Sequence, residues 1–325
     1  MNKLAQRLNF IEVELNQVDQ RLQQIVEAAS PEINDVGNYV FNGAGKRIRP
    51  TLFLLAASQS QISSMPYVDA AVALEMIHTA SLLHDDVIDQ ASTRRGKEAV
   101  HVKWNNKISV LTGDYLLSQA IEIMVSYQDW RLMEIVIEII RNMTEGEMEQ
   151  AFADHAMPDL EKRYFSWIGK KSASFFAGCC KAGALIRGAD YEEQDKWSDF
   201  GFNLGIAFQL IDDLLDYTGK NEFTGKPVFG DLNNRVLTLP LIRTREFAGQ
   251  DGIIHRVFDN KIESDHQLSE VVQAVLDSDG PQYTYQKAEE YIKRANEITE
   301  EIRGMHSLVK EALKELTRDV LDRKK

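Results

Sequence analysis

Cysteine and proline are both scarce in this 325-residue chain, which contains two cysteines and seven prolines. Two cysteines exclude a framework of several disulfides. Cys179 and Cys180 lie in an apolar stretch, where we expect small buried thiols. The few prolines leave long segments uninterrupted. Several of them separate segments with helical periodicity, namely Pro50, Pro66, Pro158, Pro227 and Pro281.

Positive charge is also scarce: the chain has 37 Lys and Arg residues against 50 Asp and Glu residues, and its net charge is −13. Without a basic stripe to neutralise phosphates, a nucleic-acid partner and electrostatic docking on an anionic membrane are not expected. No stretch reaches the roughly 18 uncharged apolar residues of a transmembrane helix, and the charged N-terminal segment lacks the apolar core of a signal peptide. We therefore predict a cytoplasmic protein without a transmembrane segment.

Apolar residues recur at spacings of three and four along most of the chain, which is the periodicity of helices and not of strands. Residues 68–89 are apolar almost all round, as is typical of an interior helix. The other segments with helical periodicity cover residues 8–29, 129–152, 164–186, 198–219 and 283–323. No low-complexity tract or linker interrupts them. We predict one all-α domain over residues 1–325, a single large helical bundle of roughly ten helices.

Two aspartate triplets carry the strongest chemical signal. Asp85, Asp86 and Asp89 end the apolar segment 68–89, and the same spacing returns 127 residues later in Asp212, Asp213 and Asp216. On a helix, residues four apart share a face, so each triplet projects carboxylates from one helix end at the rim of a deep cavity. Sites made of carboxylates suit Mg²⁺, which binds one or two carboxylates together with phosphate oxygens of a substrate. Two such triplets therefore predict a magnesium site for a diphosphate.

Basic residues lie close to these triplets and in two glycine-bearing loops, residues 42–50 and 218–236. Each one alone is typical of an ordinary surface charge, but together they predict a site for anionic substrates. The residues are Lys46, Arg47, Arg49, Arg94, Arg95, Lys171 and Lys226.

Several linked motifs resemble those of the trans-isoprenyl diphosphate synthases, all-helical enzymes that make farnesyl, geranylgeranyl and longer polyprenyl diphosphates. The motifs are "GAGKRIRP", "LLHDDVIDQASTRRG", "LTGDYLL", "KKSASFF", "FQLIDDLLDYTG", "GKPVFGDL" and "TLPLI", and they span almost the whole chain in the family's order. The resemblance implies a helical bundle around a deep central cavity, in which isopentenyl diphosphate is condensed with an allylic diphosphate such as farnesyl diphosphate. It also implies a homodimer packed through long helices, while a heteromeric synthase stays open.

The resemblance assigns a role to each of these residues. Both aspartate triplets would hold Mg²⁺, about three ions per site. The allylic diphosphate would contact Arg94, Lys171, Gln209 and Lys226. Isopentenyl diphosphate would contact Gly45, Lys46, Arg47, His78 and Arg95. The residues expected at the catalytic centre are Asp85, Asp86, Lys171 and Asp212, with Phe208 and Gln209 along the reacting carbons.

The chain departs from the family's pattern at a few positions. Arg235 and Val236 stand where many members have Gly-Lys, so a second lysine of that loop is missing, and Ser172 replaces a threonine. None of these departures removes an aspartate of either triplet. We therefore expect an active enzyme.

Product length should depend on the helix that leads into the first triplet. Ala80 and Ser81 stand where short-chain members of the family have bulky aromatic residues, and Ile77 lies one turn further from the aspartates. Since a helical turn rises about 5.4 Å, close to one extended isoprene unit, we predict an open pocket and a quinone-precursor product of roughly C30 or longer. A shorter-chain geranylgeranyl or farnesyl diphosphate synthase and the catalytic subunit of a two-component synthase are the alternatives.

Three other functions fit part of the pattern. A di-iron bundle would use Glu75 with His78 and Glu98 with His101, although the second pair follows the first too closely for two long helices. A phosphohydrolase would use the His84–Asp85 pair, but lacks the further upstream histidine. A non-catalytic scaffold subunit would be expected to lack the aspartate triplets, which are both present here.

Overall fold

Helices make up nearly all of the computed structural model, which describes residues 3–42, 45–58, 67–153, 158–218, 236–247, 253–254 and 265–324. The helices are α1 (Lys3–Arg7), α2 (Glu12–Glu27), α3 (Pro31–Phe41), α4 (Ile48–Ala57), α5 (Val68–Ile88), α6 (Val100–Lys103), α7 (Asn106–Ser126), α8 (Trp130–Ala151), α9 (Leu160–Ile168), α10 (Ser174–Ile186), α11 (Tyr191–Thr218), α14 (Leu239–Phe247), α16 (Asp265–Leu276), α17 (Gly280–Glu301) and α18 (Ser307–Leu321). The predicted all-α fold class is confirmed.

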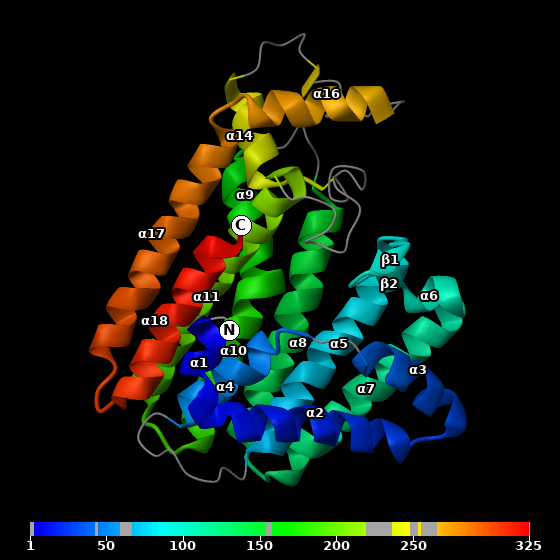
Figure 1. The fold of residues 1–325 in the computed structure, drawn as a ribbon, viewed down its shortest axis with the longest axis vertical. Helices are drawn as coiled ribbons and strands as arrows, with labels where there is room; N and C mark the ends of the chain where they lie inside the picture. Colours follow the sequence, from blue (N-terminus) through cyan, green and yellow to red (C-terminus); the bar gives the residue numbers. More distant parts are fainter. Residues whose placement is uncertain are drawn as a thin grey trace.

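The helices α4, α5, α10 and α11 form the centre of the bundle. α10 packs against α4, α8 and α11, and α5 packs against α2, α4 and α7. α17 and α18 run along one side of the molecule next to α11, while α6 and the short strands lie at the opposite side (Figure 1). Buried residues cover every side of α5, which confirms the interior helix predicted from its all-round apolar sequence.

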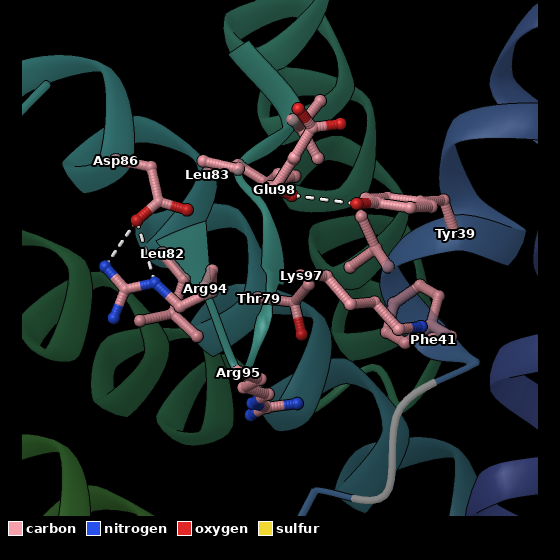
Figure 2. A pocket seen from close by; sticks show the side chains of 13 residues that line it. Tyr39, Phe41, Thr79, Leu82, Leu83, Asp86, Arg94, Arg95, Lys97 and Glu98 are labelled. Carbon is pink, nitrogen blue, oxygen red and sulfur yellow. Dashed lines mark hydrogen bonds and ion pairs between the residues drawn. The ribbon is translucent and has the colours of Figure 1, made fainter. Parts of the chain in front are cut away.

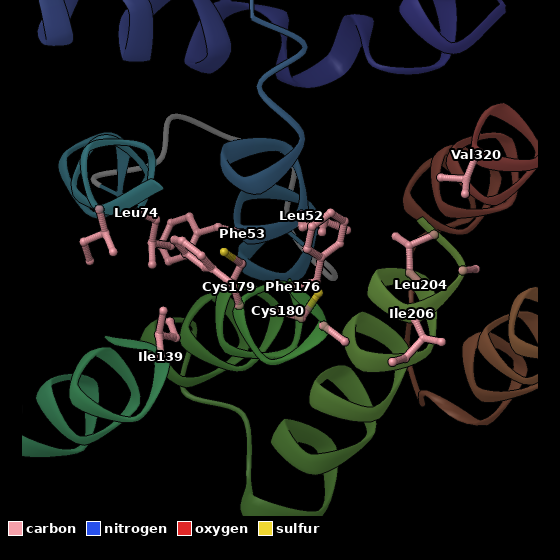
Figure 3. Close-up of a cluster of buried hydrophobic side chains, with 14 of the residues drawn as sticks. Leu52, Phe53, Leu74, Ile139, Phe176, Cys179, Cys180, Leu204, Ile206 and Val320 are labelled. Atoms are coloured by element: carbon pink, nitrogen blue, oxygen red, sulfur yellow. The ribbon is translucent and has the colours of Figure 1, made fainter. Parts of the chain in front are cut away.

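One cluster of buried hydrophobic side chains runs from Ile11 near the start of the chain to Val320 near its end. Phe53 and Phe176 lie at its centre, where α4 faces α10, and Cys179 and Cys180 point into the same region (Figure 3). Both thiols are fully buried and unbonded to each other, and burial raises the pKa of Cys180 far above its ordinary value. The prediction of small buried thiols is confirmed.

The segment after the first triplet folds as a two-stranded ribbon, which the helical periodicity did not predict. β1 (Thr93–Arg94) pairs antiparallel with β2 (Lys97–Glu98), and Arg95 and Gly96 form the turn between them. Both turn residues have positive φ, 52° and 75°, as a two-residue hairpin turn with the right-handed twist of its strands requires. The turn separates the two arginines: Arg94 lies on the strand and Arg95 at its tip.

The C-terminal amphipathic segment, residues 283–323, folds as two helices. α17 ends at Glu301 and α18 begins at Ser307, with Gly304 between them at a φ of 65° that glycine adopts without strain. This turn brings the end of α18 back beside α11, which carries the second triplet.

One described helix, α7, is long and apolar enough to cross a membrane. This is weak evidence, because the core helix of a soluble protein often has the same length and composition. Leu116, Ala120 and Met124 of α7 are buried, and the helix packs against α5. Here α7 serves as a helix of the bundle.

Replacement of Gly183 by alanine should destabilise the protein, since a Cβ there would lie 2.3 Å from the Phe53 carbonyl oxygen. The clash is with backbone, so α4 and α10 must move apart, at a cost of about 1–3 kcal/mol in the free energy of unfolding. Denaturant unfolding measures this loss. Gly169→Ala is the control, because its Cβ would meet Phe202 and Ile206 at ordinary contact distances, 3.4 and 3.9 Å; an equal loss in both variants would contradict the packing argument.

Candidate active site

The first triplet lies at the C-terminal end of α5, and its three carboxylates have different surroundings. Asp86 is 2% exposed, and its Oδ1 accepts a hydrogen bond from Arg94 Nε at 2.7 Å and a second from Arg94 Nη2. Asp85 and Asp89, four residues apart, share another face of the helix. Burial, together with the nearby Glu147 and Asp89, raises the pKa of Asp85 to about 6 against the opposing effect of Lys171 and Arg94. This face therefore concentrates negative charge.

The second triplet lies in the last two turns of α11 and repeats this arrangement with other partners. Asp213 is 4% exposed and accepts hydrogen bonds from the Tyr164 hydroxyl at 2.6 Å and from Gln209 Nε2 at 2.7 Å. The Gln209 side-chain oxygen in turn accepts from the Ser172 hydroxyl at 2.8 Å. Asp212 is exposed. In both triplets, therefore, the middle aspartate is anchored within the protein.

Lys171 lies in a π-helical turn, Gly169–Ala173, that joins α9 to α10. Its ammonium forms an ion pair with Glu147 of α8 and donates a hydrogen bond to Gln150 of α8 at 3.3 Å. Burial works to lower the pKa of Lys171, but Asp85 and Glu147 outweigh it, so the pKa is raised and the group is charged. π-Helical turns inside longer helices are often found at functional sites. Lys171 thus contacts α8 through Glu147 and Gln150, and it interacts electrostatically with Asp85 and Asp89.

A group of cations surrounds His78 on the inner side of α5. Burial, followed by the nearby Arg49 and Arg95, lowers the pKa of His78 far below its usual value, so the imidazole is neutral. The guanidinium of Arg49 lies over the rings of Phe175 and Phe176, at 4.7 and 5.2 Å from their centres, and its buried Nε has no hydrogen-bond partner among the described residues.

Gly45 provides room for this group, because a Cβ there would lie 3.0 Å from Arg95 Nη1. Lys46 is exposed and interacts electrostatically with Asp212 and with Asp319 and Arg323 at the end of α18. Arg49 interacts electrostatically with both Arg95, beside the first triplet, and Asp212 of the second. The cations therefore link the two triplets.

Arg47, in contrast, is engaged in the framework of the protein. Its Nε bonds Asp19 of α2 at 2.7 Å and its Nη1 bonds Glu75 of α5 at 2.7 Å. The side chain of Glu75 is only 3% exposed, so Arg47 is its buried counter-ion. Glu98 of the alternative di-iron pairs lies on β2 and not on a helix, and among the described residues no three His, Cys, Asp or Glu side chains form a metal site by themselves. A magnesium site differs, because it needs only one or two carboxylates together with phosphate oxygens of a substrate.

A pocket lies behind the β1–β2 ribbon, between α3 and α5 (Figure 2). In Figure 2, Arg94 points toward Asp86 and Arg95 points away from it. The ribbon is held to α3 at its edge, where the Tyr39 hydroxyl donates to the Glu98 carbonyl at 2.9 Å. Asp86, Arg94 and Arg95 line this pocket, which therefore borders the first triplet and shares Arg95 with the group around His78.

The residues predicted to control product length lie on α5. Ala80 and Ile77 are buried in the hydrophobic cluster, at 2% and 1% exposure, and the partly exposed Ser81 donates a hydrogen bond to the His78 carbonyl at 2.9 Å. Positions 80 and 81 therefore carry small side chains in the helix that leads to the first triplet. Lys226 and Arg235 lie outside the described residues.

Comparison with known proteins matches the sequence model of the polyprenyl synthetase family to residues 30–275. The chain belongs to the polyprenyl synthetase family. It is 35% identical over 264 residues to octaprenyl diphosphate synthase of Escherichia coli, covering 81% of this chain and 82% of that protein. It is 32% identical over 295 residues to heptaprenyl diphosphate synthase component 2 of Bacillus subtilis, covering 90% and 84%. The predicted family and the assignment as a prenyltransferase are confirmed.

Other members of the polyprenyl synthetase family show how far the resemblance extends. Geranylgeranyl diphosphate synthase of Sulfolobus acidocaldarius is 29% identical over 326 residues, covering 98% of both chains. The fold matches a polyprenyl synthase of Caulobacter crescentus, solved with calcium and isoprenyl diphosphate, with a TM-score of 0.92 and 29% identity over 100% of this chain and 99% of that one. Family members named for products of different length thus have similar sequence identity to this chain, 29–35%.

Magnesium, the metal expected of a polyprenyl synthetase, fits the carboxylates that the structure brings together. Burial is the main cause of the raised pKa of Asp85, so its charged form carries a desolvation cost that a bound cation would offset. The outer aspartates, Asp85 with Asp89 and Asp212 with Asp216, would hold the ions, because Arg94, Tyr164 and Gln209 already occupy the middle ones. The sequence analysis did not single out Glu147, Gln150, Tyr164 or Arg323, whose roles depend on tertiary contacts.

The raised pKa of Asp85 predicts a pH-dependent stability for the metal-free protein. Since this pKa is about 6 in the folded chain and 3.8 is its ordinary value, the folded state holds the proton more tightly, and stability falls as the pH rises from about 4 to about 6. Asp85→Asn should therefore raise the free energy of unfolding by roughly 1–3 kcal/mol at pH 7, and by little near pH 4.

Denaturant unfolding with a chelator at both pH values measures this difference. Asp114→Asn serves as the control, because Asp114 is more than half exposed on α7. A variant that is equally stabilised at pH 4 and pH 7 would contradict the electrostatic explanation.

Proposed function

We propose that this prenyltransferase condenses isopentenyl diphosphate repeatedly with an allylic diphosphate to make a long-chain all-trans polyprenyl diphosphate, roughly C30 or longer. The observation that carries the reaction is the convergence of two anchored aspartate triplets and a group of cations, linked through Arg49. The names of the E. coli and B. subtilis relatives and the small residues Ala80 and Ser81 favour a long product.

The reaction begins when the allylic C–O bond breaks and leaves an allylic cation and a diphosphate. Bound Mg²⁺ would neutralise the charge that develops on the leaving diphosphate. Lys171 and Arg94 donate hydrogen bonds to the same oxygens, and their fixed positions stabilise that charge without reorganisation. The double bond of isopentenyl diphosphate then attacks the cation and forms the new C–C bond. Loss of a proton, taken up by the released diphosphate, gives a product that is one C5 unit longer.

The group around His78 is proposed to hold isopentenyl diphosphate. His78 is neutral and can donate one hydrogen bond, while Lys46, Arg95 and Arg49 supply positive charge. The buried Nε of Arg49 has no hydrogen-bond partner in the part of the chain that the structure describes, so Arg49 suits a ligand, whereas Arg47 is committed to Asp19 and Glu75. We therefore assign to Arg49 the contact that the sequence motif gave to Arg47.

Substitution of the two arginines separates these roles. Arg49→Gln should raise the KM for isopentenyl diphosphate about 10- to 100-fold, because one hydrogen bond to a charged group is lost. Arg47→Gln should instead destabilise the protein by about 3 kcal/mol, since it leaves the Glu75 carboxylate buried without its counter-ion. Steady-state kinetics and thermal unfolding measure the two effects; the reverse pattern would return the substrate contact to Arg47.

Product length is tested by incubation of the protein with isopentenyl diphosphate, farnesyl diphosphate and Mg²⁺, followed by chromatography of the products. A product of C30 or longer is expected. Farnesyl or geranylgeranyl diphosphate as the end product would favour the short-chain alternative. Activity only after a second protein is added would favour the two-component alternative, as the name of the B. subtilis relative suggests.

Ala80→Phe should shorten the end product by one or more C5 units, because an aromatic ring would close the pocket one helical turn from Asp85. Chromatographic product sizing against the wild-type protein measures the change. The first condensation serves as the internal control, since the aspartates are untouched. Unchanged product length with normal turnover would contradict control of product length by the side chain at position 80 of α5.

The proposed enzyme is a cytoplasmic homodimer with one domain over residues 1–325. The single hydrophobic cluster from Ile11 to Val320 supports one domain. α7 and α8 present exposed apolar side chains that a second copy would cover, which suits the predicted packing through long helices. These side chains are Val110, Leu111, Val125, Trp130, Ile137 and Met148. Light scattering of the purified protein tests the dimer.

A further inference from the structure

Glu147 contacts the proposed site although no predicted role involves it. It lies on α8 and pairs with Lys171, which the proposed function places at the allylic diphosphate. Gln150, one turn further along α8, binds the same ammonium at 3.3 Å. Two side chains of one helix therefore hold the cation of another.

The backbone is shaped for this contact at Gly146, the neighbour of Glu147. A Cβ on Gly146 would lie 2.6 Å from the Lys171 backbone nitrogen and 2.9 Å from the Trp167 carbonyl oxygen. Only a residue without a side chain allows α8 to approach the π-helical turn this closely. The carboxylate of Glu147 thereby reaches the ammonium of Lys171 directly.

Lys171 has three N–H donors; its ammonium donates a hydrogen bond to Gln150 and forms an ion pair with Glu147. It can still donate a hydrogen bond to an oxygen of the substrate. The ammonium is also attracted by Asp85 and Asp89, which interact with it electrostatically. If Lys171 moved onto these carboxylates, it would occupy the place of the metal ion.

We propose that Glu147 is a positioning residue that holds the ammonium of Lys171 on α8, away from Asp85 and Asp89, so that these aspartates stay available to a divalent cation. Glu147 acts through Lys171 and does not itself touch the metal. The proposal rests on the proposed function for the identity of the substrate, but the competition between Lys171 and the metal is a property of the metal-binding face itself.

Glu147→Gln tests this directly, because it keeps the size of the side chain and removes its charge. With its counter-ion lost, Lys171 should pair with Asp85, and Mn²⁺ should bind about tenfold more weakly, a coupling typical of charges in one network. Mn²⁺ alone is the probe, and electron paramagnetic resonance of the free ion measures its binding. Glu149→Gln is the matched control: Glu149 lies two residues along α8 and pairs with Lys170 at 2.7 Å, and Mn²⁺ affinity should be unchanged.

A double-mutant cycle with Lys171→Met decides how Glu147 acts. If it acts through Lys171, Glu147→Gln should have no effect on Mn²⁺ affinity once Lys171 is removed. An equal loss in both backgrounds would make Glu147 a metal ligand and overturn the proposal, as would unchanged Mn²⁺ affinity in Glu147→Gln alone. Thermal unfolding confirms that each variant is folded.

This cycle does not depend on turnover, so it separates the proposal from the proposed function. Wild-type protein that binds Mn²⁺ and shows the coupling, yet forms no prenyl product, would overturn the function alone. Wild-type protein that makes polyprenyl products without the coupling would overturn the role of Glu147 alone.

Discussion

Negative charge concentrated at the ends of two core helices is the constraint on which the rest of this structure depends. A carboxylate beside a hydrophobic core is costly unless it is hydrogen-bonded or paired. The protein meets this cost for one aspartate of each triplet, with Arg94 at Asp86 and with Tyr164 and Gln209 at Asp213. The outer aspartates would hold the metal ions, as carboxylates do in a magnesium–diphosphate site.

The surrounding backbone is shaped by this requirement. The two-residue turn at Arg95 and Gly96 sends one arginine back to Asp86 and leaves the other at the tip of the ribbon. The π-helical turn places Lys171 against α8, and Gly146 permits the close approach. The hairpin turn carries Arg94, which binds Asp86, and the π-helical turn carries Lys171, which interacts electrostatically with Asp85, so both irregularities serve the first triplet.

Stability and function oppose each other at Asp85. Its raised pKa shows that the folded, metal-free protein holds this carboxylate at a cost. A bound cation would offset this desolvation cost, so metal binding would stabilise the folded protein. Burial of positive charge is costly in the same way at Arg49, which lies against two aromatic rings and whose Nε has no hydrogen-bond partner within the described segments.

The sequence by itself determined the helical class, the interior position of α5, the buried cysteines and the two triplets. These depend on periodicity and spacing within one helix, and local sequence encodes both. The family resemblance followed from motifs in order. Product length stays a proposal, which rests on the small residues Ala80 and Ser81 of α5.

Only the tertiary structure decided which of two neighbouring arginines is committed to the framework. Arg47 and Arg49 are two residues apart in one motif, yet Arg47 is bound by α2 and α5 while Arg49 lies against α10. The anchors of the middle aspartates and the pairing of Lys171 with Glu147 were likewise absent from the sequence analysis. Such contacts join residues far apart in the chain, and their geometry is set by how whole helices pack.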